Sequence, residues 1–461
     1  MSERSCSIFY RLFSTSTAVL LVVVIALAGR VVFFSSKETG DQQRYLTAAK
    51  WISSGEGFGP DGKLGAKWPH GYPMFLACVL SFNGSLSWVR MVQISLSLTS
   101  CFLVYQTIAW RDRRFAFIAA TVIAMSPLMC RYASLIVSEV FSVFLMSLLF
   151  WIISRNEQSD SLIWPTSIGA LCVAAVLTAP GTLFICFLLL LAVVYKNKAR
   201  PLAVLLVHLG ALALLVPWQT HCLMQTGRLQ PTIYDHKSTP TLTSGFALWF
   251  RTWHITEYNI AVFRFNQPKY WHERAPNRAF SSNAQKDSLT RTYEEFSQGR
   301  LEWESLDAVF REAAVDSIDS DPMSFYVILP AARSLLLWFY PQSVVWPDRS
   351  GPLGHIKWYT DAPWRVKWWS TLAWRSAIAL LFIVLMGRAL RTRDPVALAI
   401  VGGVVLFTLA GSVLAQHEAR RCMVFYPAIL FLSTRQKSVE STCPYAPTST
   451  VNQDAVRTLP Q

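Results

Sequence analysis

The feature that most constrains this chain is a long apolar run near its start. Residues 16–34 read STAVLLVVVIALAGRVVFF, which is long enough to cross a bilayer hydrocarbon core of roughly 30 Å. Further apolar runs follow along the chain. Because backbone polar groups inside lipid must be satisfied internally, each run predicts a helix. The first run is longer than the core of a signal peptide and lacks a cleavage site, so we expect a retained span.

The composition fits a chain that is embedded in a membrane. Of the 461 residues, 52% are hydrophobic and 15% are charged, whereas charged residues make up roughly a quarter of an ordinary soluble domain. The net charge is +14, but the basic residues fall in short clusters between apolar runs, as topology signals do. We therefore expect no nucleic-acid partner. The nine cysteines show no CxxC pair and no ligand spacing, which indicates packing roles.

The apolar runs together predict an all-α integral membrane protein with about ten transmembrane helices. The pattern contains no internal repeat of solenoid length. Several of the predicted spans are short. They cover residues 16–34, 88–110, 115–129, 135–153, 163–178, 183–195, 202–220, 369–386, 395–414 and 423–433.

The clusters of Lys and Arg in the short loops predict the orientation. With ten spans, all of these clusters fall on one side, which is the cytoplasmic side by the positive-inside rule. We therefore expect residues 35–87, 221–367 and 416–421 to face away from the cytoplasm. The clusters are Arg4 and Arg11; Arg111, Arg113 and Arg114; Lys196, Lys198 and Arg200; Arg388, Arg391 and Arg393; and Arg435 and Lys437.

One segment, residues 323–340, is apolar enough to be an eleventh span. Counting it as a span would move the basic cluster at residues 388–393 to the outer side. We therefore interpret the segment as a helix in the outer interface, with Trp338, Phe339 and Tyr340 as aromatic anchors.

Four regions follow from this topology. The first is a membrane module, residues 1–220, whose outer loop 35–87 carries the candidate chemistry. Next come an outer loop or small cap with the interfacial helix, residues 221–367, and the C-terminal transmembrane helices, residues 368–434. The polar tail, residues 435–461, is expected to be disordered and cytoplasmic.

The first outer loop begins with a predicted short amphipathic helix at residues 41–52. Its apolar positions, among them Tyr45, Ala49 and Trp51, suit a helix that lies on the bilayer surface. Asp41 stands at the N-terminal end of this helix, where a helix-capping role would explain it fully.

The polar motifs of this loop resemble those of the GT-C glycosyltransferases that use polyprenyl-phosphate sugars. That class includes the dolichyl-phosphate-mannose protein mannosyltransferases and the bacterial aminoarabinose transferase of lipid A. The resemblance covers about the first 200 residues and the last 50. It rests on Asp41 with Tyr45, Gly55-Glu56-Gly57-Phe58, Pro69-His70-Gly71-Tyr72-Pro73, Ser126-Pro127, Arg131-Tyr132, Ser138-Glu139, His417-Glu418-Ala419-Arg420-Arg421 and Phe425-Tyr426-Pro427.

The resemblance implies a GT-C fold and roles for two carboxylates. Asp41 would be the general base that deprotonates the acceptor hydroxyl, as the matching carboxylate is thought to act in inverting members. Glu139 stands at the outward end of a span, where an ionisable group is costly enough to suggest a role. It would position the acceptor or hold a cation; the alternative is an interfacial residue paired with Arg131. Gln42 follows Asp41, so no second acidic residue stands directly beside it, but Asp41 and Glu139 on separate loops could share one divalent cation.

The same resemblance implies a site for the donor phosphate. Arg420 and Arg421 would bind it, because a guanidinium fork fits phosphate oxygens. Their alternative role is merely to border the last span. Lys67 and His70 are further candidates for phosphate binding, and Tyr45 and Tyr72 would line the site.

The function that follows is transfer of one sugar, a hexose or a pentose, from a polyprenyl-phosphate donor, with inversion. The acceptor would be a lipid, a glycan or a protein outside the cytoplasm. We expect a plasma or inner membrane protein whose site faces the periplasm or exterior, without a certain cofactor. Two alternatives stay open. A transporter or lipid flippase would place charged or helix-breaking residues near mid-membrane, and a membrane scaffold would need none of the outer polar motifs.

Overall fold

The structure is a computed structural model that describes residues 15–36, 40–56, 70–157, 161–226, 244–255, 275–339, 362–413 and 419–435. Every regular element in these ranges is a helix, and they contain no strand. The predicted all-α fold is therefore confirmed for the described part of the chain.

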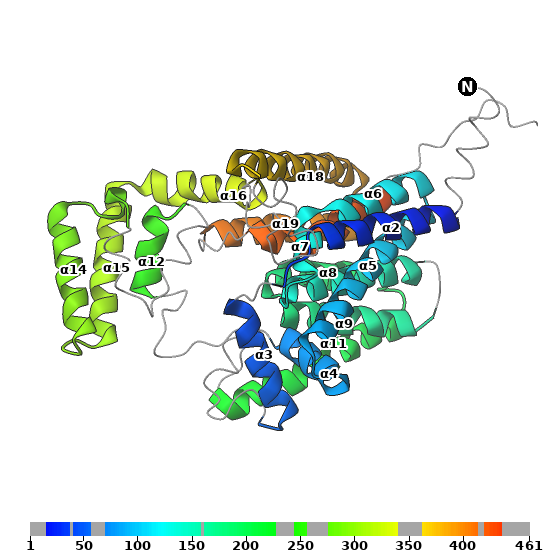
Figure 1. The fold of residues 1–461 in the computed structure, drawn as a ribbon, viewed down its shortest axis with the longest axis horizontal. Helices are drawn as coiled ribbons and strands as arrows, with labels where there is room; N and C mark the ends of the chain where they lie inside the picture. Colours follow the sequence, from blue (N-terminus) through cyan, green and yellow to red (C-terminus); the bar gives the residue numbers. More distant parts are fainter. Residues whose placement is uncertain are drawn as a thin grey trace, which may run out of the picture.

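Apolar helices build a bundle, and shorter helices lie within it, beside it and in a unit to one side of it (Figure 1). The bundle contains α2 (Thr15–Val32), α5 (Leu86–Ala109), α6 (Arg113–Met125), α8 (Ser138–Asn156), α9 (Ile163–Thr178), α10 (Leu183–Lys196), α11 (Pro201–Thr226), α18 (Trp364–Thr392) and α19 (Pro395–Val413). The other elements are α3 (Gly40–Ser53), α4 (Gly71–Phe82), α7 (Pro127–Tyr132), η1 (Pro180–Thr182), α12 (Gly245–Trp253), η4 (Asn277–Ala279), α14 (Asn283–Ser297), α15 (Trp303–Ser320), η5 (Ser324–Ile328), α16 (Leu329–Phe339), η7 (Ala419–Phe425), α20 (Tyr426–Phe431) and η8 (Leu432–Arg435).

Five of the described helices are long and apolar enough to cross a membrane, namely α5, α8, α11, α18 and α19. The number rises to six if α15 and the helix that follows it, which meet at a bend of 99°, form one broken span. These findings support an integral membrane protein but do not establish ten spans. The third predicted span is interrupted, since α6 ends at Met125 and a new helix begins at Pro127. Proline disfavours helical geometry in the residue before it, here Ser126.

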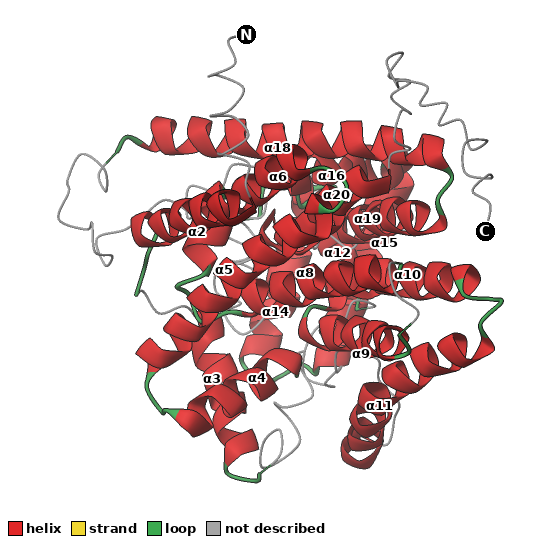
Figure 2. Cartoon of the chain, turned by 90° about the vertical axis from the view of Figure 1, so that its right-hand side faces the viewer, coloured by secondary structure: helices red, strands yellow, loops and turns green. Residues whose placement is uncertain are grey.

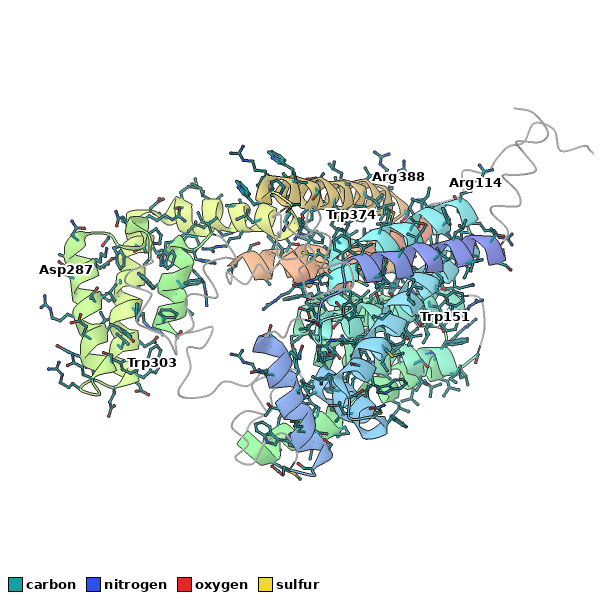
Figure 3. The ribbon with its side chains drawn as sticks, viewed as in Figure 1. Arg114, Trp151, Asp287, Trp303, Trp374 and Arg388 are labelled. Atoms are coloured by element: carbon teal, nitrogen blue, oxygen red, sulfur yellow. The ribbon has the colours of Figure 1, made fainter. Side chains whose placement is uncertain are left out.

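Ion pairs bring three helix ends together at one face of the bundle. The Lys196 ammonium lies 3.0 Å from a carboxylate oxygen of Glu157 and 3.1 Å from one of Asp394. The ends of α8 and α10 therefore meet the start of α19 at one face, as the ten-span topology requires. Figure 3 places Arg114 and Arg388 toward the same end of the molecule, with Asp287 at the opposite end.

A separate aromatic core lies in the unit formed by α12, η4, α14 and α15, which we call the cap. In Figure 1 the cap stands apart from the bundle and is joined to it by α16. Trp249 and Phe310 are fully buried in its core, and their ring centroids lie 5.1 Å apart. The indole nitrogen of Trp249 donates to the Ala279 carbonyl at 2.9 Å. The cap thus has its own hydrophobic centre.

The segment interpreted as an interfacial helix forms η5 and α16, and α16 packs on α19 and α18 (Figure 2). Arg333, 1% exposed, donates to the carbonyls of His254 at 2.8 Å, Arg251 at 2.5 Å and Ser412 at 3.1 Å. One guanidinium therefore ties the end of α12 to the end of α19. The side chain of Trp338, which we expected to anchor in the interface, stacks on Phe382 and donates to Thr408.

Candidate outer-face site

The loop at residues 35–87, which we predicted to be outer, contains the predicted surface helix, now α3, which begins at Gly40 and ends at Ser53. Its inner face carries Tyr45 and Ala49, which are one turn apart and buried. These residues pack against Tyr72 and Leu76 of α4. The glycine before Tyr72 is required, because a Cβ on Gly71 would collide with Thr178 at the end of α9. The Pro-His-Gly-Tyr-Pro motif therefore fixes α4 against the bundle.

Two tyrosines connect these helices to the start of α8. The rings of Tyr45 and Tyr72 meet edge to face, with centroids 4.9 Å apart. The hydroxyls of Tyr45 and Ser138 lie 3.3 Å apart and share a hydrogen bond. Both tyrosines, predicted as site-lining residues, are thus brought next to the Ser138-Glu139 pair.

The hydroxyl of Tyr72 is buried in this region without a hydrogen-bond partner among the described residues. The side chain as a whole is fully buried. Burial raises the pKa of the Tyr72 phenol, and the nearby Tyr45 and Glu139 raise it further. Tyr72 therefore stays protonated at neutral pH and offers an O–H donor.

Glu139 lies in the first turn of α8 and is 9% exposed. A carboxylate at this position is favoured by the positive end of the helix dipole. The chain just before α8 is held by Gln93, whose amide donates to the carbonyls of Leu135 at 3.1 Å and Val137 at 3.2 Å. Glu139 directly follows Ser138, whose hydroxyl meets that of Tyr45, and the ring of Phe141 in the same helix lies 6.4 Å from the ring of Tyr72.

Asp41 is the second residue of α3, one turn before Tyr45, and its side chain is 22% exposed. Its carboxylate lies 3.8 Å from the guanidinium of Arg44. Such a pair at the surface is worth less than about 1 kcal/mol. Asp41 is thus on the same helix as Tyr45, and its role as a base stays a prediction.

His70 is 2% exposed and precedes α4. Its ring meets the ring of Trp218 edge to face at 4.1 Å, and the ring of His221 lies 6.5 Å away. The sequence alone did not point to Trp218 or His221, because the folded chain, and no local pattern, brings the end of α11 next to His70. Lys67, the other candidate here, lies outside the described residues.

The two C-terminal arginines begin the last apolar segment. They lie in η7, which packs against α8 and α7, so the basic turn borders the helix that carries Glu139. Arg421 is exposed, and the side chain of Arg420 is outside the described part of the structure.

A metal site stays a prediction. Within the described ranges, no three His, Cys, Asp or Glu side chains are grouped closely enough to hold a metal ion. The sharing of one cation by Asp41 and Glu139, two residues on different helices, is not tested by this finding.

Comparison with known proteins gives only distant similarity. No family model and no curated protein matches the chain. Among solved structures, the chain is similar to ArnT from Cupriavidus metallidurans bound to undecaprenyl phosphate, at 15% identity, covering 89% of this chain and 78% of that chain, with a TM-score of 0.39. The apo state of the same protein gives 13% identity, 92% and 78% coverage and a TM-score of 0.38. These scores are too low to establish a shared fold.

Proposed function

We propose that the chain is a membrane glycosyltransferase of GT-C type that moves a sugar from a polyprenyl-phosphate donor to an acceptor on the outer side. The observation that carries this proposal is the convergence of α3, α4 and α8, where Tyr45 contacts Tyr72 and Ser138, the residue before Glu139. These residues come from three motifs separated in the sequence, and all three motifs resemble those of the same enzyme class.

The buried hydroxyl of Tyr72 supports a ligand at this place. A buried polar group without a partner costs about 1–3 kcal/mol, and a bound oxygen acceptor would remove that cost. A donor phosphate or a sugar hydroxyl presents such an acceptor. Since Tyr72 keeps its proton, the phenol can donate to either one.

The proposed reaction is a single displacement. Asp41 takes the proton of the acceptor hydroxyl, the oxygen attacks the anomeric carbon, and the bond from that carbon to the phosphate oxygen breaks. The leaving group is the polyprenyl phosphate, whose charge Arg420, Arg421, Lys67 and His70 would stabilise. Attack from the face opposite the phosphate inverts the anomeric centre.

The transporter alternative draws on charged residues inside the spans, and their contacts favour structural roles. Arg30 in α2 is 1% exposed and donates to Ser97 at 2.7 Å and to the Ala124 carbonyl at 2.7 Å. Arg375 in α18 donates to the carbonyls of Leu337 at 2.6 Å and Trp338 at 3.0 Å. Both cations thus join neighbouring helices, which explains their place in the bundle without a transport pathway.

The test is an assay of membranes that contain the protein with labelled polyprenyl-phosphate sugars. We expect Asp41→Asn to lower transfer by roughly 100-fold or more, the usual contribution of a general base. Asp112→Asn is the matched control, because Asp112 caps α6, remote from α3, and asparagine also caps helices well. Equal transfer by Asp41→Asn and the wild type would refute the base role. If the wild type transfers sugar from none of the donors, the proposal that the chain is a glycosyltransferase is refuted.

A further inference from the structure

A pocket of about 260 Å³ lies at the end of the bundle where Lys196 meets Glu157 and Asp394. It is formed where α8 gives way to α9 and where α10 gives way to α11. By the topology above, this end is the cytoplasmic one. The proposed transfer site uses none of its residues. The pocket is lined by Asn156, Ser161, Leu162, Pro165, Asn197, Arg200, Leu202 and Ala203.

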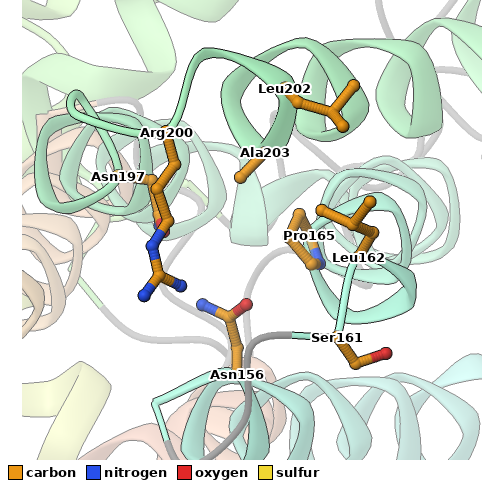
Figure 4. A pocket seen from close by; sticks show the side chains of 8 residues that line it. All are labelled: Asn156, Ser161, Leu162, Pro165, Asn197, Arg200, Leu202 and Ala203. Carbon is orange, nitrogen blue, oxygen red and sulfur yellow. The ribbon is translucent and has the colours of Figure 1, made fainter.

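One wall of the pocket is polar and suits an anion. Figure 4 shows the Arg200 guanidinium and the Asn156 amide reaching toward each other across the pocket from different segments. Ser161 adds a hydroxyl to the lining. A guanidinium carries five N–H donors in a planar fork, so it can bind phosphate oxygens in addition to other partners.

The other wall is apolar and continues onto the outside of the bundle. Leu202 lines the pocket and is 51% exposed. From it a stripe of exposed residues runs along α11, with Leu205 at 52%, Leu209 at 48% and Leu212 at 47%. Their spacing of three or four residues places them on one face of the helix. A hydrocarbon chain that leaves the pocket would therefore find a continuous apolar track.

We propose that this pocket binds the phosphodiester headgroup of an anionic membrane phospholipid, with Arg200 on the phosphate and an acyl chain along α11. The volume is below the roughly 300–1,000 Å³ of pockets that enclose whole drug-sized ligands, so it fits a headgroup and leaves the tails outside. Basic pockets between transmembrane helices at the cytoplasmic side are known to hold such headgroups.

The charges around the pocket favour an anionic lipid over a neutral one. Glu157 and Asp394 both pair with Lys196 and so do not oppose the phosphate at full strength. The Lys198 ammonium lies 4.9 Å from the ring centroid of Tyr195, which is 60% exposed. An exposed tyrosine at the end of a span marks the level of the lipid headgroups.

The test measures retention of lipid by the full chain in detergent, using native mass spectrometry with phosphatidylglycerol and phosphatidylcholine as the two probes. We expect the protein to prefer phosphatidylglycerol, and Arg200→Gln to weaken its binding about tenfold, the loss of one charge-assisted contact. Ser161→Glu should produce a similar loss through repulsion while leaving Arg200 in place. Arg114→Gln removes the same charge at the same end, away from the pocket, and should change little.

Three results would overturn the proposal. One is unchanged binding of phosphatidylglycerol by Arg200→Gln and Ser161→Glu. Another is an equal loss in Arg114→Gln, which would mean an unspecific charge effect. The third is displacement of the lipid by inorganic phosphate at equal concentration, which would mean a site for a soluble anion. The assay contains no transfer step, so its outcome is independent of the proposed function.

Discussion

Replacing Tyr72 with phenylalanine should make the protein more stable and less active. The substitution removes one hydroxyl and keeps the ring that packs on Tyr45. In the free protein this hydroxyl is buried and has no hydrogen-bond partner among the described residues. During transfer, by contrast, the hydroxyl would donate to an oxygen of the bound donor.

Two free energies set the expected changes in melting temperature and in kcat/KM. Removing a hydroxyl that has no partner relieves about 1–3 kcal/mol of desolvation, which corresponds to a rise in melting temperature of roughly 1–4 °C for a chain of this size. Losing a hydrogen bond to a charged phosphate costs about 1.5–3 kcal/mol. That free energy corresponds to a loss of roughly 10- to 150-fold in kcat/KM.

The assays are thermal unfolding of the purified protein and transfer from a labelled polyprenyl-phosphate sugar. Tyr105→Phe is the matched control. The Tyr105 hydroxyl is likewise buried without a described partner, but Tyr105 belongs to α5 and to the main bundle core. Tyr105→Phe should therefore raise the melting temperature and leave transfer unchanged.

A lower melting temperature in Tyr72→Phe would refute the reasoning, because it would mean that the hydroxyl is already bonded in the free protein. Unchanged transfer would remove Tyr72 from the site. The two readouts move in opposite directions only if the hydroxyl is unsatisfied when the site is empty and bonded when it is full.

Three further predictions concern the bundle, the cap and pH. Arg333→Met should lower the free energy of unfolding by about 3 kcal/mol, because it leaves three buried carbonyls without their donor. Limited proteolysis should then release the cap faster than in the wild type. An unchanged digestion rate would contradict this prediction. Gly169→Leu should lower the melting temperature, since even a Cβ would collide with the backbone of α11 at Val207, whereas Gly387→Ala, with open space around it, should raise it slightly through helix propensity. The pKa of Tyr72 is raised in the folded state, so the unfolded chain releases this proton at lower pH than the folded chain does. The free energy of unfolding therefore falls as the pH rises above about 10. Between pH 8 and 11 the melting temperature should fall less steeply with pH in Tyr72→Phe than in the wild type.

Periodicity and hydropathy located most of the bundle helices from the sequence. The run at residues 163–178 became α9 with the same bounds, because an apolar run flanked by polar loops leaves few alternatives in lipid. The count of spans was less predictable. Ser126 and Pro127 divide one run into α6 and α7, and residues 323–340 join the bundle through contacts that no local pattern encodes.

The candidate site was predictable only in part. The motifs supplied Tyr45, Tyr72 and Glu139, and the fold brings these three together. The arginines that hold helices to each other were missed, because Arg30 and Arg333 bond to hydroxyls and backbone carbonyls, whose positions do not show in the sequence. Trp218 was missed for a similar reason, since its contact with His70 depends on how far α11 extends.

The last apolar segment has a consequence for how the protein is made. Residues 421–434 pass through η7, α20 and η8, and nearly all of their apolar side chains are buried in the main core. This segment therefore belongs at the centre of the bundle and not at its lipid-facing surface. All the other described helices precede it in the chain and are therefore synthesised earlier. The earlier helices must wait, inserted but loosely associated, until this segment has been made, so a chain cut after Val413 would yield a bundle that cannot close, however many of its helices have entered the membrane.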